Sequence, residues 1–138
     1  QNDPANASWK IRHLSDKIYN YLDEIIETKE FSTEDMDLLI VTSGATVRAS
    51  QAAVQQARDE GMKVGLLQLI TVWPFADEKI AELAAGARCI LVPEMNLGQM
   101  VHEVRRVVGT EMPVYSLPKS NGQGIEPEEI LEKIREVY

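Results

Sequence analysis

A short segment after an apolar run carries the residues that could do acid–base or hydrogen-bonding chemistry. Glu94, Asn96 and Gln99 place one carboxylate and two amides close together, with Gly98 between the amides. The carboxylate could serve as a general acid or base, or it could accept hydrogen bonds from nearby backbone amides. Asn96 is also a good cap for the helix predicted to follow. No histidine or second acid stands close by in the sequence, so the segment predicts no catalytic residue.

A second segment, Trp73-Pro74-Phe75, places two large aromatic side chains around a proline after another apolar run. One of the two rings is expected in the core. Two rings flanking a proline exceed what a turn requires, and exposed apolar patches usually mark an interface. For Trp73 the sequence leaves core and interface equally open.

The other candidates for chemistry do not form a recognisable site. Residues 43–46 (Ser-Gly-Ala-Thr) could cradle a phosphate at a helix N-terminus. Their single glycine matches neither the dinucleotide-binding nor the P-loop motif, which favours a tight turn capped by one of the hydroxyl residues. Cys89 is the only cysteine, which excludes an internal disulfide and a four-cysteine iron–sulfur site. His13 and His102 lack metal-ligand spacing, so no metal site is expected.

The composition excludes several classes of protein. The 138 residues carry a net charge of -8, and the Lys and Arg residues are scattered, which argues against a nucleic-acid surface. No signal peptide is recognisable and no apolar run approaches the ~20 residues of a membrane helix, so we expect a cytoplasmic protein without a membrane partner. Residues 1–7 are polar and predict a linker or a cloning remnant, and residues 8–138 predict one domain.

Four apolar runs of strand type alternate with helical patterns along the chain. This alternation is typical of a mostly parallel sheet covered by helices on both faces. A helix is expected from Ser8 to about residue 24. The weak alternation of residues 26–31 indicates a short edge strand, and the very short turn between it and Asp37 favours an antiparallel direction. The predicted fold class is therefore α/β, a three-layer α/β/α sandwich around a five-stranded, mostly parallel sheet. The parallel strands are residues 38–42, 64–70, 89–92 and 113–117, and the helices are residues 46–60, 77–85, 98–108 and those from 127 onward.

The two candidate segments should lie at one edge of the sheet. The carboxyl ends of parallel strands emerge together, and partners bind there in open α/β folds. Aromatic anchors surrounded by polar groups are the composition of an interface centre and its rim. The predicted interface comprises Trp73, Pro74, Phe75, Glu94, Asn96, Gly98 and Gln99.

Several motifs occur in the order and spacing of a known family. They are residues 39–45 (Leu-Ile-Val-Thr-Ser-Gly-Ala), residues 61–67 (Gly-Met-Lys-Val-Gly-Leu-Leu), Trp73-Pro74-Phe75 and residues 93–100 (Pro-Glu-Met-Asn-Leu-Gly-Gln-Met). They resemble the C-terminal part of the alpha subunit of 2-oxoacid:ferredoxin oxidoreductases, which is similar to the C-terminal domain of transketolase. The resemblance covers roughly residues 12–138.

This resemblance implies an enzyme that oxidatively decarboxylates a 2-oxoacid, such as 2-oxoglutarate or pyruvate, to an acyl-CoA. It implies thiamine diphosphate, magnesium and iron–sulfur clusters in the complete complex, with ferredoxin as electron acceptor. The domain itself is expected to bind no cofactor and to be inactive by itself. Its implied partners are an N-terminal thiamine-type domain of the same subunit and the beta and other subunits, and a homodimer is left open.

Two other interpretations remain at this point. One is the C-terminal domain of a transketolase or of a 2-oxoacid dehydrogenase beta chain, which shares the fold. The other is a free-standing α/β binding module without an enzyme context. The Trp73-Pro74-Phe75 and 94–100 strings fit the ferredoxin-linked family better, so the expected role is a non-catalytic assembly domain of such an enzyme.

Overall fold

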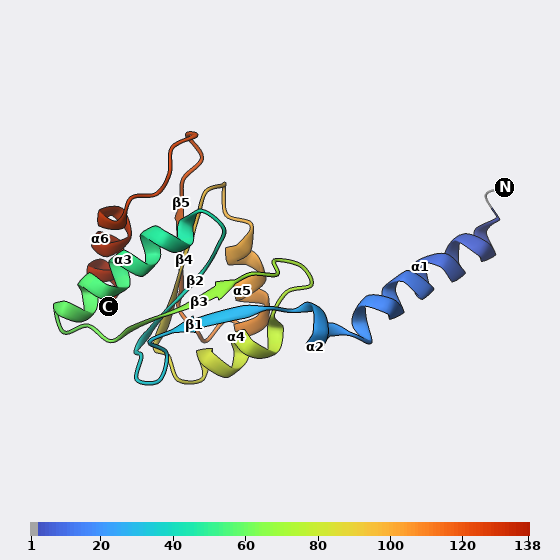
Figure 1. Ribbon diagram of the computed structural model, residues 1–138, viewed down its shortest axis with the longest axis horizontal. Coiled ribbons are helices and arrows are strands. Elements are labelled where there is room, and N and C mark those ends of the chain that lie inside the picture. The colour runs from blue at the N-terminus through green and yellow to red at the C-terminus, as the bar shows by residue number, and fades with distance from the viewer. Residues whose placement is uncertain (1–2) are drawn as a thin grey trace.

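The fold is built around a five-stranded sheet (Figure 1). The computed structural model describes residues 3–138, and its strands lie in the order β1-β3-β2-β4-β5. Four strands are parallel, and the edge strand β1 pairs with β3 in the antiparallel sense, which confirms the predicted sheet. The strands are β1 (Thr28–Phe31), β2 (Leu38–Ser43), β3 (Val64–Leu69), β4 (Cys89–Glu94) and β5 (Val114–Pro118).

Helices cover both faces of this sheet. α3 (Thr46–Asp59) and α6 (Pro127–Val137) pack on one face, and α4 (Asp77–Ala84) and α5 (Met100–Val108) pack on the other (Figure 1). The central strands β2 and β4 are buried along almost their whole length. Strands with both faces buried read as continuous apolar runs, which is why the sequence showed runs here instead of alternation.

The core consists of two apolar clusters, one on each side of the sheet. Leu39 and Val41 of β2 belong to the cluster beneath α4 and α5, whereas Leu38 and Ile40 belong to the cluster beneath α3 and α6. Successive side chains of a strand point to opposite faces, so one apolar run supplies both clusters. In β3, a Cβ on Gly65 would lie 2.8 Å from Met36 Sδ and 2.9 Å from the Ser32 carbonyl oxygen, so only glycine lets the segment after β1 pack this closely.

The N-terminal helix α1 (Pro4–Tyr19) projects away from the sheet and contains no buried residue (Figure 1). It begins before the predicted start at Ser8, because Pro4 suits the first helical position and the Asp3 side chain accepts a hydrogen bond from the Ala5 amide. It also ends before the predicted residue 24, and the short α2 (Leu22–Ile25) follows.

Residues 1 and 2 of the predicted linker lie outside the described part of the chain. The proposed division into a linker and one domain stays a prediction. Between residues 3 and 138, no helix has both the length and the apolar character needed to span a membrane.

Candidate functional site

Two loops at the carboxyl edge of the sheet form the candidate site. The loop after β3 covers residues 70–76, and the loop after β4 covers residues 95–99. Both strands run parallel to β2, which lies between them, so the two loops leave the sheet at the same edge. Two strand spacings separate them, about 10 Å. A single partner can therefore touch both loops.

The two aromatic residues of the first loop point in different directions. Phe75 is half-buried and packs against the core cluster that contains Ala76 and Ile80. Pro74 between them is buried, and Trp73 is 65% exposed. The structure thus rules out the core alternative for Trp73, because only Phe75 joins the core, and the interface alternative stays a prediction.

Four further apolar side chains on these loops were not singled out from the sequence. Ile70 and Val72 flank Trp73 on the first loop, and Met95 and Leu97 lie on the second. All four are exposed, Leu97 to 86%. The sequence contained a signal for Leu97 that was missed. An apolar residue between Asn96 and Gly98 lies in a polar turn, where its side chain is expected to be exposed. We call Ile70, Val72, Trp73, Met95 and Leu97 the apolar rim.

Glu94 fixes the conformation of the second loop from its buried side. Its side chain is buried, and its carboxylate accepts hydrogen bonds from three backbone amides at the start of α5. These donors are the amides of Gln99 at 3.2 Å, Met100 at 2.5 Å and Val101 at 3.1 Å. The first amides of a helix have no partner within the helix, and a carboxylate there also meets the positive end of the helix dipole. Glu94 is therefore engaged in capping α5, which does not favour an acid–base role.

Asn96 does not cap α5, contrary to the prediction. The helix begins at Met100, and the Asn96 Oδ1 atom accepts hydrogen bonds from the amides of Gly98 at 2.7 Å and Gln99 at 3.1 Å inside the loop. Gly98 has a φ of +98°, a value that favours glycine, and it is buried beneath the exposed Gln99. These residues hold the loop in the shape that exposes Leu97. Their assignment to an interface stays a prediction.

The turn after β2 borders a small cavity next to Glu94. Gly44 adopts a φ of +60°, and its carbonyl oxygen accepts a hydrogen bond from the Val47 amide. The predicted tight turn is present, but no side chain caps α3, so the expected hydroxyl cap is wrong. The cavity between the turn and the Glu94 loop measures about 210 Å³. It is below the usual size of a ligand pocket, roughly 300–1,000 Å³.

The described side chains offer no ligand set for a metal ion or for a four-cysteine iron–sulfur cluster. Among residues 3–138 there is no cluster of three or more His, Cys, Asp or Glu side chains that could hold a metal ion. The one thiol, Cys89, is buried in the sheet, and burial raises its pKa. A four-cysteine cluster site cannot be built from it. That this domain binds no cofactor nevertheless remains a prediction.

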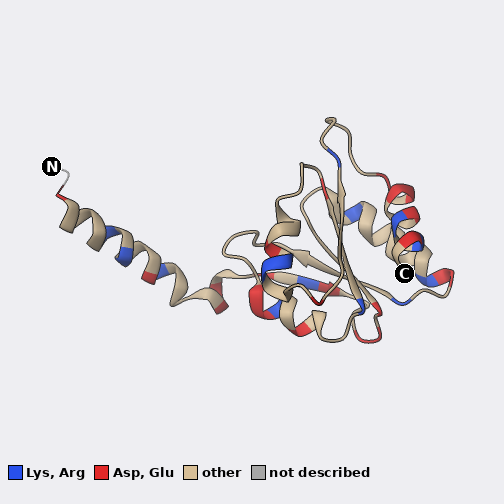
Figure 2. Cartoon of the chain, turned by 180° about the vertical axis from the view of Figure 1, so that it is seen from behind, with Lys and Arg blue, Asp and Glu red and all other residues tan. Residues whose placement is uncertain are grey.

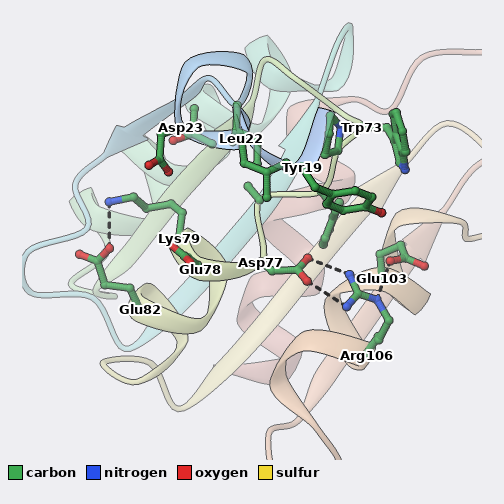
Figure 3. Close-up of a pocket in the computed structure, with 15 residues that line it drawn as sticks. Tyr19, Leu22, Asp23, Trp73, Asp77, Glu78, Lys79, Glu82, Glu103 and Arg106 are labelled. Atoms are coloured by element: carbon green, nitrogen blue, oxygen red, sulfur yellow. Dashed lines mark hydrogen bonds and ion pairs between the residues drawn. The ribbon is translucent and has the colours of Figure 1, made fainter. Parts of the chain in front are cut away.

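An open groove of about 720 Å³ lies beside Trp73 and is bordered by α2, α4 and α5 (Figure 3). On one side, the Arg106 guanidinium donates to both carboxylate oxygens of Asp77 at 2.7 and 3.0 Å and to Glu103 at 2.8 Å. These two carboxylates, Asp77 first, raise the pKa of Arg106. The bonds link α5 to the start of α4 and thereby fix the loop that carries Trp73.

The chain is similar to proteins with named activities. The profile of the family described as pyruvate:ferredoxin oxidoreductase core domain II matches residues 36–130. The 2-oxoglutarate synthase subunit KorA of Methanothermobacter marburgensis is 40% identical over 133 residues, which is 96% of this chain and 36% of that protein. The ketoisovalerate oxidoreductase subunit VorB of the same organism is 35% identical over 125 residues, which is 91% of this chain and 35% of that protein.

A solved structure shares the fold over nearly the whole chain. It is the 2-oxoglutarate:ferredoxin oxidoreductase from Magnetococcus marinus with 2-oxoglutarate, coenzyme A and succinyl-CoA bound. The TM-score is 0.82 at 26% identity, over 99% of this chain and 24% of that chain. This chain spans about a third of the length of the two curated relatives.

Proposed function

This chain belongs to the family of pyruvate:ferredoxin oxidoreductase core domain II, and we propose from this premise that it is a non-catalytic assembly domain of a 2-oxoacid:ferredoxin oxidoreductase alpha subunit. The complete enzyme would convert a 2-oxoacid, such as 2-oxoglutarate or pyruvate, to an acyl-CoA by oxidative decarboxylation. Thiamine diphosphate, magnesium and iron–sulfur clusters would be held by other parts of that complex, and ferredoxin would accept the electrons. The names of the relatives support this reaction class, and they differ in the 2-oxoacid.

The apolar rim is the observation that carries the assembly role. Five apolar side chains from two loops are exposed at one edge of the sheet. Glu94, the carboxylate of the second loop, has its oxygens occupied by backbone amides. An apolar centre with Asn96 and Gln99 at its margin matches the anatomy of an interface, where a few aromatic anchors contribute most of the binding energy. The rim thus supports binding of a protein surface better than binding of a substrate.

We assign the partner at the rim to the same oxidoreductase. The two candidates are the N-terminal thiamine-type domain of the same subunit and the beta subunit. Either one would cover Trp73 and Leu97, while Pro74, Phe75, Glu94 and Gly98 hold the two loops in position from the buried side. The predicted interface residues would then have two tasks, contact and support.

Trp73→Ala tests this proposal in the intact oxidoreductase. Because Trp73 is largely exposed, the substitution should barely change the melting temperature of this chain alone. It should weaken assembly of the complex by on the order of 2 kcal/mol or more, about thirtyfold in the dissociation constant. Assembly is measured by titrating the variant chain or subunit against its partners and following complex formation by light scattering.

Tyr115→Ala is the matched control, because Tyr115 is a second exposed aromatic residue that lies on β5 and outside the rim. It should leave assembly unchanged. If Trp73 were a core residue instead of a contact residue, Trp73→Ala would destabilise this chain and leave assembly unchanged. A loss of roughly 3–5 kcal/mol in the stability of the Trp73→Ala chain, with unchanged assembly, would rule out the interface.

A further inference from the structure

α1 exposes an apolar face that lacks a partner within the described residues. Ala7, Ile11, Leu14 and Ile18 recur at helical spacing and therefore share one side of the helix. Ile11 is 68% exposed and Leu14 is 60% exposed. A helix of 16 residues gains little stability in water from its own hydrogen bonds, and most helices in proteins are stabilised by packing of such a face. The apolar face of α1 therefore needs another surface to pack against.

The charge of α1 restricts the composition of the surface that can pack on its apolar face. α1 holds three of the 14 Lys and Arg residues and one of the 22 acidic residues, so its net charge is +2 and the remainder of the chain carries -10. Figure 2 shows the acidic residues spread over the body from which α1 projects. Lys10 and Lys17 both neighbour Leu14 on the helix surface, at i−4 and i+3. That surface should therefore be apolar in its centre and acidic at its border.

The groove beside Trp73 has this composition. Leu22, Ile26 and Phe75 are half-buried and form its apolar part. Among its carboxylates, Glu82 pairs with Lys79, and Asp77 and Glu103 pair with Arg106 (Figure 3). Asp23 and Glu78 also line the groove, and they form no ion pair with any residue between 3 and 138. We call this site the acidic groove.

The helix of the same molecule does not fill the acidic groove. Tyr19, the last residue of α1, borders the groove, and from there the helix projects away from the body (Figure 1). The chain therefore carries both a basic apolar helix and an acidic apolar groove, and the two do not meet within this molecule. In a pair of molecules, α1 of each molecule can pack in the acidic groove of the other.

We propose that α1 of one copy docks in the acidic groove of a second copy, and that the exchange is reciprocal about a two-fold axis. Exchange of identical elements closes a dimer with the same contacts on both sides. Each helix is about 24 Å long and about 10 Å wide, so two helix faces and two grooves bury on the order of 1,000 Å² in total. That area is the lower limit of a specific interface, so the dimer should dissociate on dilution and weaken as salt rises.

This inference goes beyond the assembly role proposed above and does not rest on it. The acidic groove shares Trp73 with the apolar rim, but Leu97 and Met95 of the rim do not line it. Leu97→Ala should therefore leave the dimer intact, whether or not the rim binds a partner subunit.

The oligomeric state of the 138-residue chain tests the inference. Sedimentation velocity over a dilution series should show a monomer–dimer equilibrium. Leu14→Asp should raise the dissociation constant by about tenfold or more, because it places a charge in the centre of the contact. Trp9→Asp is the matched control, since Trp9 lies on the opposite side of α1 and is also exposed, and it should leave the dissociation constant within about twofold. A chain that stays monomeric throughout, or a dimer that Leu14→Asp leaves unchanged, would overturn the proposal.

Charge-reversal variants test whether the acidic groove is the site where α1 docks. The pair Asp23→Lys and Glu78→Lys should weaken the dimer, and the pair Lys10→Glu and Lys17→Glu should do the same. The four substitutions combined should restore it, whereas Arg12→Glu, on the far side of α1, should have little effect. Thermal unfolding of each variant checks that the body is folded. Weakening by both pairs without restoration by their combination would place the docked helix elsewhere and contradict the inference.

Discussion

Glu94 is a carboxylate at the end of a buried strand, and its surroundings decide its role. Three amide hydrogens at the start of α5 point at its two oxygens, and the side chain has almost no contact with solvent. A buried polar group is costly unless hydrogen bonds compensate it, and here the helix terminus supplies them. The residue that looked most like a catalyst thus serves to fix the loop that presents Leu97.

We expect Glu94→Ala to lower the free energy of unfolding by about 1–3 kcal/mol, because it leaves buried amides without an acceptor. Glu94→Gln should cost less, since the amide oxygen still accepts one of these bonds. Urea denaturation followed by circular dichroism measures both variants. Asn96→Ala, which affects only bonds within the exposed loop, is the milder comparison. Equal stability of Glu94→Ala and the natural chain would contradict the capping role.

α6 shows how an element is fixed at its first turn. Pro127 occupies the first helical position, and the carboxylate of Glu129 accepts a hydrogen bond from the Glu126 amide at 2.8 Å and another from Lys119 Nζ at 2.8 Å. The amide of Glu126 and then Lys119 lower the pKa of Glu129. The helix start is thereby joined to the residue that follows β5. The helix then packs Ile130 and Ile134 on the sheet.

The lowered pKa of Glu129 predicts an acid-dependent contribution to stability. A carboxyl whose pKa is lower in the folded than in the unfolded chain stabilises the fold above its ordinary value of 4.5, and this contribution is lost as the pH falls through the lower folded value. Glu129→Gln should therefore be less stable than the natural chain at neutral pH, and the difference should shrink on acidification below about pH 4.5. Denaturant midpoints across this pH range measure it.

Glu128→Gln is the control for this titration. Glu128 stands in the same turn but makes no side-chain hydrogen bond within residues 3–138. Its replacement removes the same charge without removing the cap. If the stability difference between Glu129→Gln and the natural chain did not change with pH, the role of the Glu129 carboxylate would be contradicted.

The whole molecule combines a closed core with two open surfaces. The sheet and its four covering helices bury the apolar side chains of both clusters. The apolar rim and the exposed face of α1 lie outside that core, on the carboxyl edge of the sheet and on the projecting helix. A domain that folds around its own sheet and leaves such surfaces open is suited to assembly into a larger enzyme.

We expect the 138-residue chain to be inactive by itself. The described residues offer no metal cluster, and the carboxylate at the carboxyl edge is occupied by amides. The chain is assayed with thiamine diphosphate, magnesium, coenzyme A, a dye acceptor and either 2-oxoglutarate or pyruvate. The intact oxidoreductase serves as the positive control. Turnover above background by the purified chain would refute the non-catalytic role.

The sequence by itself determined the fold to within a few residues at most boundaries. Apolar runs separated by helical patterns favour a parallel sheet between helices, and the weakly alternating edge strand, which the family resemblance also supported, corresponds to β1. Periodicity succeeds here because it reports which faces are buried, and the burial of apolar side chains is what chiefly stabilises these helices and strands.

Only the tertiary structure separated residues that look alike in the sequence. Trp73 and Phe75 flank the same proline, and which ring reaches the core depends on where α4 lies against the sheet. The sequence favoured Asn96 as the cap of α5 and left Glu94 to bond nearby backbone amides, and the path of the intervening loop brought Glu94 to the start of the helix. The helical spacing of α1 was visible in the sequence, but the surface that packs on its apolar face was not, because periodicity reveals that a face needs cover and not which surface covers it.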